Sequence, residues 1–137
     1  MTWSSGSFRD AFVEVVQRSG RWRDLEPEAL LGRWDRFVAD CESGYPYDME
    51  DYFDDGTSRD SIERVLNTPE LQDFSGMVVF RTRVEIIDAR FRPLLIPDVF
   101  PKFDEGRWWA RGLVRYARRK LVSELWELFG IEITEVG

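Results

Sequence analysis

Carboxylate side chains at helical spacing are the residues of this chain best placed to do chemistry. Glu50 and Asp54 are four residues apart, as are Asp51 and Asp55, so each pair would share one face of a helix. Paired carboxylates of this kind can hold Mg²⁺, which makes a magnesium-dependent hydrolase one alternative for the function. A calcium-binding loop through Asp51 and Asp55 does not fit, because Ile62 would fall where that loop requires a bidentate acid.

Most other catalytic chemistries lack the residue types that they need. The chain has no His and a single Cys, Cys41. Nucleophilic catalysis with a His base, zinc sites built from His and Cys, and di-iron sites with Glu-x-x-His pairs are therefore excluded in their usual forms. Cys41 lies on the apolar stripe of an expected helix, where it would behave as a small buried hydrophobe. We expect no metal, no cofactor and no enzymatic activity.

The segment from residue 40 to residue 55 interleaves acidic and aromatic side chains and contains no base. Aromatic rings supply contact area, and carboxylates speed the encounter with a positively charged surface. This pattern predicts a surface that binds a basic protein. The candidate partner-binding residues are Tyr45, Tyr47, Asp48, Glu50, Asp51, Tyr52, Asp54 and Asp55. The alternative is that Tyr45, Tyr52 and Phe53 belong to the core, with the acids outside it.

The charges of the chain are separated along the sequence. The net charge is -7, yet residues 40–63 hold nine acids against one base, and residues 102–120 hold seven bases against two acids. Either these two blocks face each other in the fold, or the acidic block is free to attract a cation. The expected last helix carries four arginines on one face, which could bind nucleic acid: Arg107, Arg111, Arg115 and Arg118. A pI near 4.7 argues against that reading, and no nucleic-acid partner is expected.

Composition and periodicity predict a mostly α protein with a single helical domain over residues 1–137, built as a bundle of five or six helices. The apolar spacing predicts helices over 8–20, 27–44, 77–91 and 104–128, with a short helix over 48–55 and another over 57–66. Residues 93–103, with three prolines, are expected to be an extended connection without regular structure, and 131–137 could form a short extended tail. No apolar run reaches the roughly 18 to 20 residues of a membrane span, and no apolar leader opens the chain. We therefore expect a cytoplasmic protein without a membrane partner.

In size, acidity and helical class, and in its tyrosines among carboxylates, the chain resembles the small acidic immunity proteins with which bacteria inhibit basic nuclease toxins. This resemblance implies a non-enzymatic inhibitor of a basic partner, and it carries no residue assignment. The order of five short patterns also resembles small uncharacterised bacterial proteins: Trp34-x-x-Phe37-Val38, Gly44-Tyr45, Tyr52, Arg59-Asp60 and Trp108-Trp109. A self-associating structural subunit that uses Trp3, Trp22 and Trp108 is a further alternative, so a homo-oligomer is possible.

Overall fold

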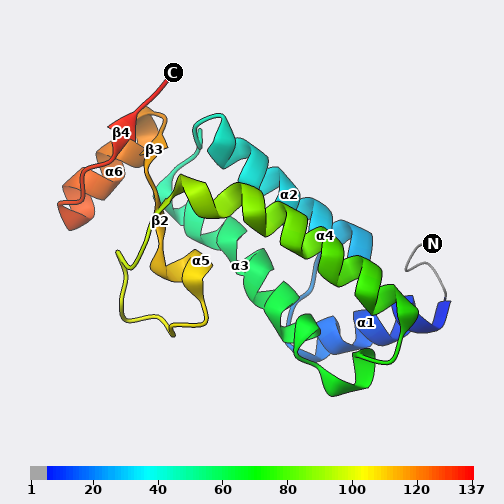
Figure 1. Ribbon diagram of the computed structural model, residues 1–137. Coiled ribbons are helices and arrows are strands. Elements are labelled where there is room, and N and C mark those ends of the chain that lie inside the picture. Colours follow the sequence, from blue (N-terminus) through cyan, green and yellow to red (C-terminus); the bar gives the residue numbers. More distant parts are fainter. Residues whose placement is uncertain (1–5) are drawn as a thin grey trace.

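Six α-helices dominate the computed structural model, which describes residues 6–137 (Figure 1). They are α1 (Gly6–Arg18), α2 (Pro27–Glu42), α3 (Met49–Leu66), α4 (Ser75–Phe91), α5 (Trp108–Arg111) and α6 (Arg119–Phe129). Two 3₁₀ turns, η1 (Pro69–Leu71) and η2 (Arg92–Leu94), and four two-residue strands complete the fold. The strands are β1 (Leu95–Ile96), β2 (Leu113–Val114), β3 (Tyr116–Ala117) and β4 (Thr134–Glu135). The expectation of a mostly helical protein is confirmed.

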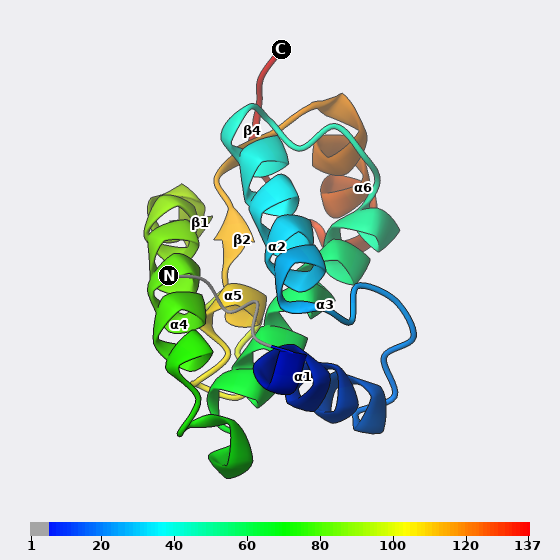
Figure 2. The same cartoon turned by 90° about the vertical axis from the view of Figure 1, so that its right-hand side faces the viewer.

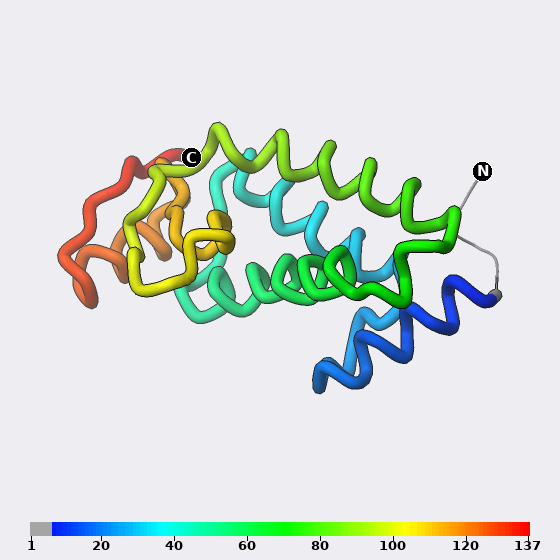
Figure 3. The backbone as a smooth tube through the Cα atoms, turned by 60° about the horizontal axis from the view of Figure 1, so that its bottom comes forward, coloured from blue at the N-terminus to red at the C-terminus, as the bar shows by residue number. Residues whose placement is uncertain are grey.

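The three longest helices, α2, α3 and α4, lie side by side and form the body of the molecule (Figure 1). Figure 2 shows α1 running across this bundle near one end. Helix α6 and the C-terminal tail lie at the opposite end, as the tube view also shows (Figure 3). Buried residues of all six helices belong to one hydrophobic cluster, whose largest fully buried side chain is Trp34 in the middle of α2.

Helix α2 follows directly from its sequence. Pro27 occupies the first turn, where its missing N–H costs nothing, and the predicted apolar stripe from Leu30 to Cys41 is buried. After the helix, the backbone turns at Gly44, whose φ of +97° is in the left-handed region. A Cβ at Gly44 would also lie 2.7 Å from Val136 Cγ2, so the turn requires glycine for two reasons.

Helix α3 is one continuous helix of 18 residues, and the expected break at residues 55–57 is wrong. Asp48 caps it as predicted, because its side chain accepts a hydrogen bond from the N–H of Asp51 at 2.8 Å. Gly56 lies in the helix interior and does not end it, since buried neighbours on either side hold the chain in the helix: Tyr52, Ser58, Arg59 and Ile62.

The single helix expected over 104–128 is also wrong, and so is the absence of regular structure in the stretch 93–103. Residues 113–117 are extended and form hydrogen bonds on both sides. Arg115 N donates to Leu94 O at 2.8 Å, and Thr134 N donates to Arg115 O at 3.0 Å. On one side β2 pairs antiparallel with β1, and on the other β3 pairs in parallel with β4. Gly112 allows this packing, since a Cβ there would lie 2.9 Å from Leu95 Cδ1.

The tail after α6 is extended, as expected, and β4 ties it to β3. Helix α6 ends at Gly130, which has a φ of +65° and whose N–H donates to Trp126 O at 2.9 Å. Across residues 6–137, no helix has both the length and the apolar character needed to cross a membrane.

Candidate functional site

The aromatic residues of the acidic segment divide between core and surface. Tyr45 is fully buried and Tyr52 is 4% exposed, so their inclusion in a partner-binding surface is wrong. The Tyr45 hydroxyl donates to Asp55 Oδ2 at 2.7 Å, and the Tyr52 hydroxyl accepts from Val114 N at 3.3 Å. Burial is the main cause that raises the pKa of both phenols above the ordinary value. Tyr47, in contrast, is 51% exposed.

Three acids of the segment are neutralised by arginines from elsewhere in the fold. Asp54 Oδ2 lies 2.9 Å from Arg23 Nη2, and Asp55 Oδ1 lies 3.6 Å from Arg33 Nη2. Glu42 Oε1 lies 2.8 Å from Nη2 of an arginine in α4, Arg90. None of these arginines belongs to the basic block 102–120. That block contacts the acidic segment through Arg118, which donates to the backbone carbonyls of Ser43 and Gly44 and not to a carboxylate.

The acids at the N-terminal end of α3, unlike Asp54, Asp55 and Glu42, form no ion pair with a described Lys or Arg. Within the described chain, no Lys or Arg nitrogen lies within 4 Å of the carboxylates of Asp48, Glu50 or Asp51. Glu124 of α6 adds a further carboxylate here, which accepts from Met49 N at 2.7 Å. The pKa of Asp51 is raised by desolvation and then by Asp48, followed by weaker effects of other acids. The N–H groups at the start of α3 stabilise this charge in part.

Tyr47 and Asp51 line a hollow of about 270 Å³ between α2 and the start of α3. Asp40 and Asp55 also line it, and the pKa of Asp40 is raised by burial and then by the charge of Asp55. Arg33 and Arg36 are the cations of this hollow. We call the exposed Tyr47 together with Asp48, Glu50 and Asp51 the acidic end of α3.

The four arginines expected on one helix face do not share a helix. Arg107 binds Asp60 of α3, with Nη2 at 3.0 Å from both carboxylate oxygens, and this is a direct contact between the acidic and basic blocks. Arg111 binds Asp98 at 2.8 Å, and Arg118 donates to the backbone carbonyl of Gly44 at 3.2 Å. The expected arrangement of the four arginines on one face of a helix is therefore wrong.

The structure also bears on Cys41 and on the possible magnesium site. Cys41 is a free, fully buried thiol, as expected, and burial raises its pKa above the ordinary value. Among residues 6–137, no group of three or more Asp, Glu or Cys side chains is arranged to hold a metal ion. The magnesium-dependent hydrolase stays a prediction.

Tryptophans invoked for self-association lie in different surroundings. Trp22 is 80% exposed, whereas Trp108 is half-buried beneath Arg92, whose Cζ lies 3.8 Å from the ring centroid. Trp3 lies outside the described residues. Helix α6 exposes three large apolar side chains, Trp126, Leu128 and Phe129. Self-association stays a prediction.

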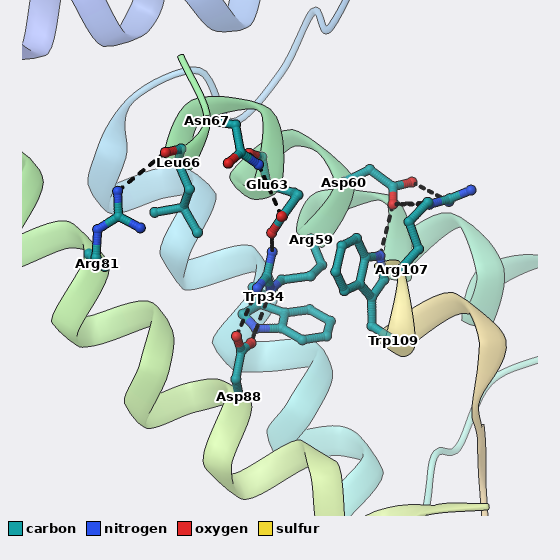
Figure 4. A network of polar contacts seen from close by, with 10 residues as sticks. All are labelled: Trp34, Arg59, Asp60, Glu63, Leu66, Asn67, Arg81, Asp88, Arg107 and Trp109. Atoms are coloured by element: carbon teal, nitrogen blue, oxygen red, sulfur yellow. Dashed lines mark hydrogen bonds and ion pairs between the residues drawn. The ribbon is translucent and has the colours of Figure 1, made fainter. Parts of the chain in front are cut away.

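A buried ion pair links α3 to α4 and was not expected from the sequence (Figure 4). Asp88 Oδ1 accepts from Trp34 Nε1 and from Arg59 Nε, both at 3.0 Å, and Asp88 Oδ2 accepts from Arg59 Nη2 at 2.8 Å. Burial tends to lower the pKa of Arg59, but the carboxylates of Asp88 and Glu63 outweigh it and raise that pKa. The available signal was Asp88 itself, a charge four residues from Val84 on the buried stripe of α4.

Beside this ion pair lies an apolar cavity of about 220 Å³ between α2, α3, α5 and the loop before α5. At its edge, Asp60 accepts from Trp109 Nε1 at 2.8 Å and from Arg107 (Figure 4). The ring of Trp109 also contacts the guanidinium of Arg59, whose Cζ is 4.5 Å from the ring centroid. The cavity and the acidic end of α3 are the two candidate sites.

Comparison with known proteins adds no relative: no protein-family model, curated protein or solved structure matches the chain.

Proposed function

We propose that this protein is a non-enzymatic, cytoplasmic binding domain that docks a basic protein on the acidic end of α3. In this proposal it acts as bacterial immunity proteins do, by covering a positively charged surface of a toxin-like partner. Buried Tyr45 and Tyr52 take no part, and Asp54 and Asp55 contribute less than their neighbours because they are already paired with Arg23 and Arg33.

One observation carries the proposal. Asp48, Glu50 and Asp51 have no cation within 4 Å among residues 6–137, while an exposed ring, Tyr47, lies next to them. Their charge therefore reaches solvent, where it attracts a basic surface and raises the rate of association. Tyr47 then supplies contact area that a purely solvated acidic surface lacks.

The acids at the start of α3 have a competing explanation, which is that they stabilise the helix itself. Carboxylates in the first turn of α3 stabilise the helix through its dipole, and Asp48 also caps it. That effect needs no partner. A decisive experiment must therefore remove charge at this place and compare it with equal removal elsewhere.

A capture experiment separates the two explanations. The tagged protein is used as bait in a native lysate of its source cells, at about 0.05 M and about 0.5 M salt. The test variant is D48N/E50Q/D51N, in which the asparagine introduced at position 48 retains the capacity to cap α3. The control variant D73N/E85Q/D104N removes the same charge from exposed acids that form no ion pair with another described residue.

We expect the wild type and the control to capture the same basic protein at low salt, and the test variant to capture it at least about tenfold less. Higher salt should weaken capture by the wild type. An inhibitor should also suppress the activity of the captured protein when the two are mixed. Capture that is equal for the test and control variants, or that ignores salt, would overturn the proposal.

A further inference from the structure

The apolar cavity beside α3 has the size and walls of a small-molecule site. Its volume of about 220 Å³ exceeds the roughly 150 Å³ of an apolar cavity that is known to hold benzene. Six of its lining residues are aromatic, namely Trp34, Phe37, Tyr52, Phe53, Phe103 and Trp109. Binding pockets for small molecules are typically apolar, rich in aromatic rings and edged by a few fixed polar groups.

The polar groups at the edge of the cavity are fixed and mutually neutralised. Asp60 accepts from Arg107 Nε at 3.2 Å, from Arg107 Nη2 at 3.0 Å and from Trp109 Nε1 at 2.8 Å. The Arg107 guanidinium also contacts the ring of Phe103, with Cζ 5.0 Å from the centroid. A charged ligand would lose its hydration without gaining an unpaired counter-charge, so a neutral ligand is favoured.

Gly56 leaves this cavity open on the α3 side. It lines the cavity in the helix interior, and a Cβ there would meet no atom within 4 Å, so neither crowding nor a left-handed backbone requires a glycine. Glycine in a helix interior is less favourable than alanine. Gly32 of α2 has the same freedom but does not line the cavity, so a helical glycine alone marks no site. At Gly56, the missing side chain preserves space beside the aromatic walls.

We infer that this cavity binds a small neutral aromatic molecule of one or two rings. The ring lies among the aromatic side chains, next to the Asp60 and Arg107 pair, and it enters beside Gly56 and the exposed Thr57. This site is separate from the acidic end of α3. It stands whether or not the protein docks a basic partner.

The experiment uses the full chain, with indole as the probe and indole-3-acetate as a charged molecule with the same ring. Melting temperature and calorimetric titration report binding, and the ¹H–¹⁵N resonance of Trp109 Nε1 reports its place. Variant G56L fills the cavity, and G32L makes the same change in a helix away from it. Variant A110L fills the cavity from α5 and gives a second test if G56L does not fold.

We expect indole at ten times its Kd to raise the Tm of the wild type and of G32L by about 3–5 °C. G56L and A110L should lose this rise, and the Trp109 Nε1 resonance should shift only in the proteins that bind. Indole-3-acetate should bind at least about tenfold more weakly.

Several results would overturn the inference. No saturable binding of indole up to millimolar concentration, an unchanged Tm rise in both filling variants, or equal binding of indole-3-acetate would each do so. Binding of the capped peptide Gly-Trp-Gly in the absence of any binding of indole would reassign the cavity to a side chain of a partner protein.

Discussion

Removal of the Asp88 carboxylate should destabilise the protein more than any change at a surface ion pair. The side chain of Asp88 is 12% exposed and that of Arg59 is 5% exposed. Each charge is therefore stabilised mainly by the other and little by water. In the variant Asp88→Ala, Glu63 is the one carboxylate among residues 6–137 that still pairs with Arg59, and its side chain is 40% exposed. Trp34 Nε1 loses its acceptor.

The magnitude follows from these contacts. Loss of a charged hydrogen-bonding partner costs about 1.5–3 kcal/mol, and a buried N–H without an acceptor costs about 1–3 kcal/mol. Breaking a buried ion pair by removing one partner costs about 3–5 kcal/mol in general, which agrees with these contributions. We therefore expect Asp88→Ala to lower the free energy of unfolding by about 3–5 kcal/mol. Since domains are stable by only about 5–15 kcal/mol, this loss is large.

Urea unfolding followed by circular dichroism measures this change, with Asp35→Ala as the control. Asp35 forms a pair of the same type with Arg90 at 2.6 Å, but its side chain is 52% exposed and Arg90 keeps Glu42. The control should cost less than about 1 kcal/mol. Equal costs for Asp88→Ala and Asp35→Ala would refute the view that burial makes this ion pair important.

A double variant separates the lost pair from the unpaired charge. In Arg59→Met with Asp88→Leu, both charges are replaced by apolar side chains of similar size, so no buried guanidinium remains without its carboxylate. The double variant should therefore be more stable than Asp88→Ala, with a coupling energy of about 1–3 kcal/mol between the two positions. If the double variant is destabilised by more than the sum of the two single changes, Arg59→Met and Asp88→Leu, this account is contradicted.

Buried groups with raised pKa values give two further predictions. Cys41, Tyr45 and Tyr52 hold their protons more tightly in the folded state, so each contributes stability that is complete below its unfolded pKa and is lost above it. Each of the three groups contributes about 1.4 kcal/mol per pH unit, so above about pH 10 the free energy of unfolding should fall by about 4 kcal/mol per pH unit. Tyr52→Phe should reduce this slope by about 1.4 kcal/mol per pH unit. An unchanged slope in urea unfolding at several pH values would contradict the prediction. The Cys41 thiol should not react with a disulfide reagent at about pH 8 until urea unfolds the chain, and rapid reaction of the native protein would show that the thiol is accessible.

Local periodicity was sufficient for the helices whose apolar residues pack in a single stripe. The spacing of Leu30, Trp34 and Phe37 in α2, and of Phe80 and Ile87 in α4, matches the side chains that are buried. These helices were predictable because one face packs against the core and the other meets water. The cap of α3 was also predictable, because Asp48 accepts from the N–H of Asp51, only three residues away.

Long-range pairing explains where periodicity failed. Residues 113–117 carry apolar residues at spacings compatible with a helix, but their backbone bonds to Leu94 on one side and to Thr134 on the other. These partners lie far away in the sequence, and no local pattern encodes them. Gly112 was the remaining clue, because the close approach of Leu95 leaves no room for a side chain there.

The candidate sites were predictable only in part, because sequence spacing does not say which side of a residue meets the core. Tyr45 and Tyr52 are seven residues apart and both pack against Phe37, at ring distances of 5.6 and 5.4 Å. Composition placed them with the acids, whereas packing places them beneath the acids. Tyr47, which lies between them in the sequence, is 51% exposed.

Helix α3 joins the two candidate sites at different points along its length. Glu50 and Asp51 are exposed near its start, and Gly56 lines the cavity further along. Asp51 and Gly56 are separated by about 140° around the helix axis and by about 7.5 Å along it, so each can be changed without touching the other. G56L should therefore leave salt-dependent capture intact, and D48N/E50Q/D51N should leave indole binding intact. Loss of both activities in either variant would mean that the acidic end and the cavity form one site.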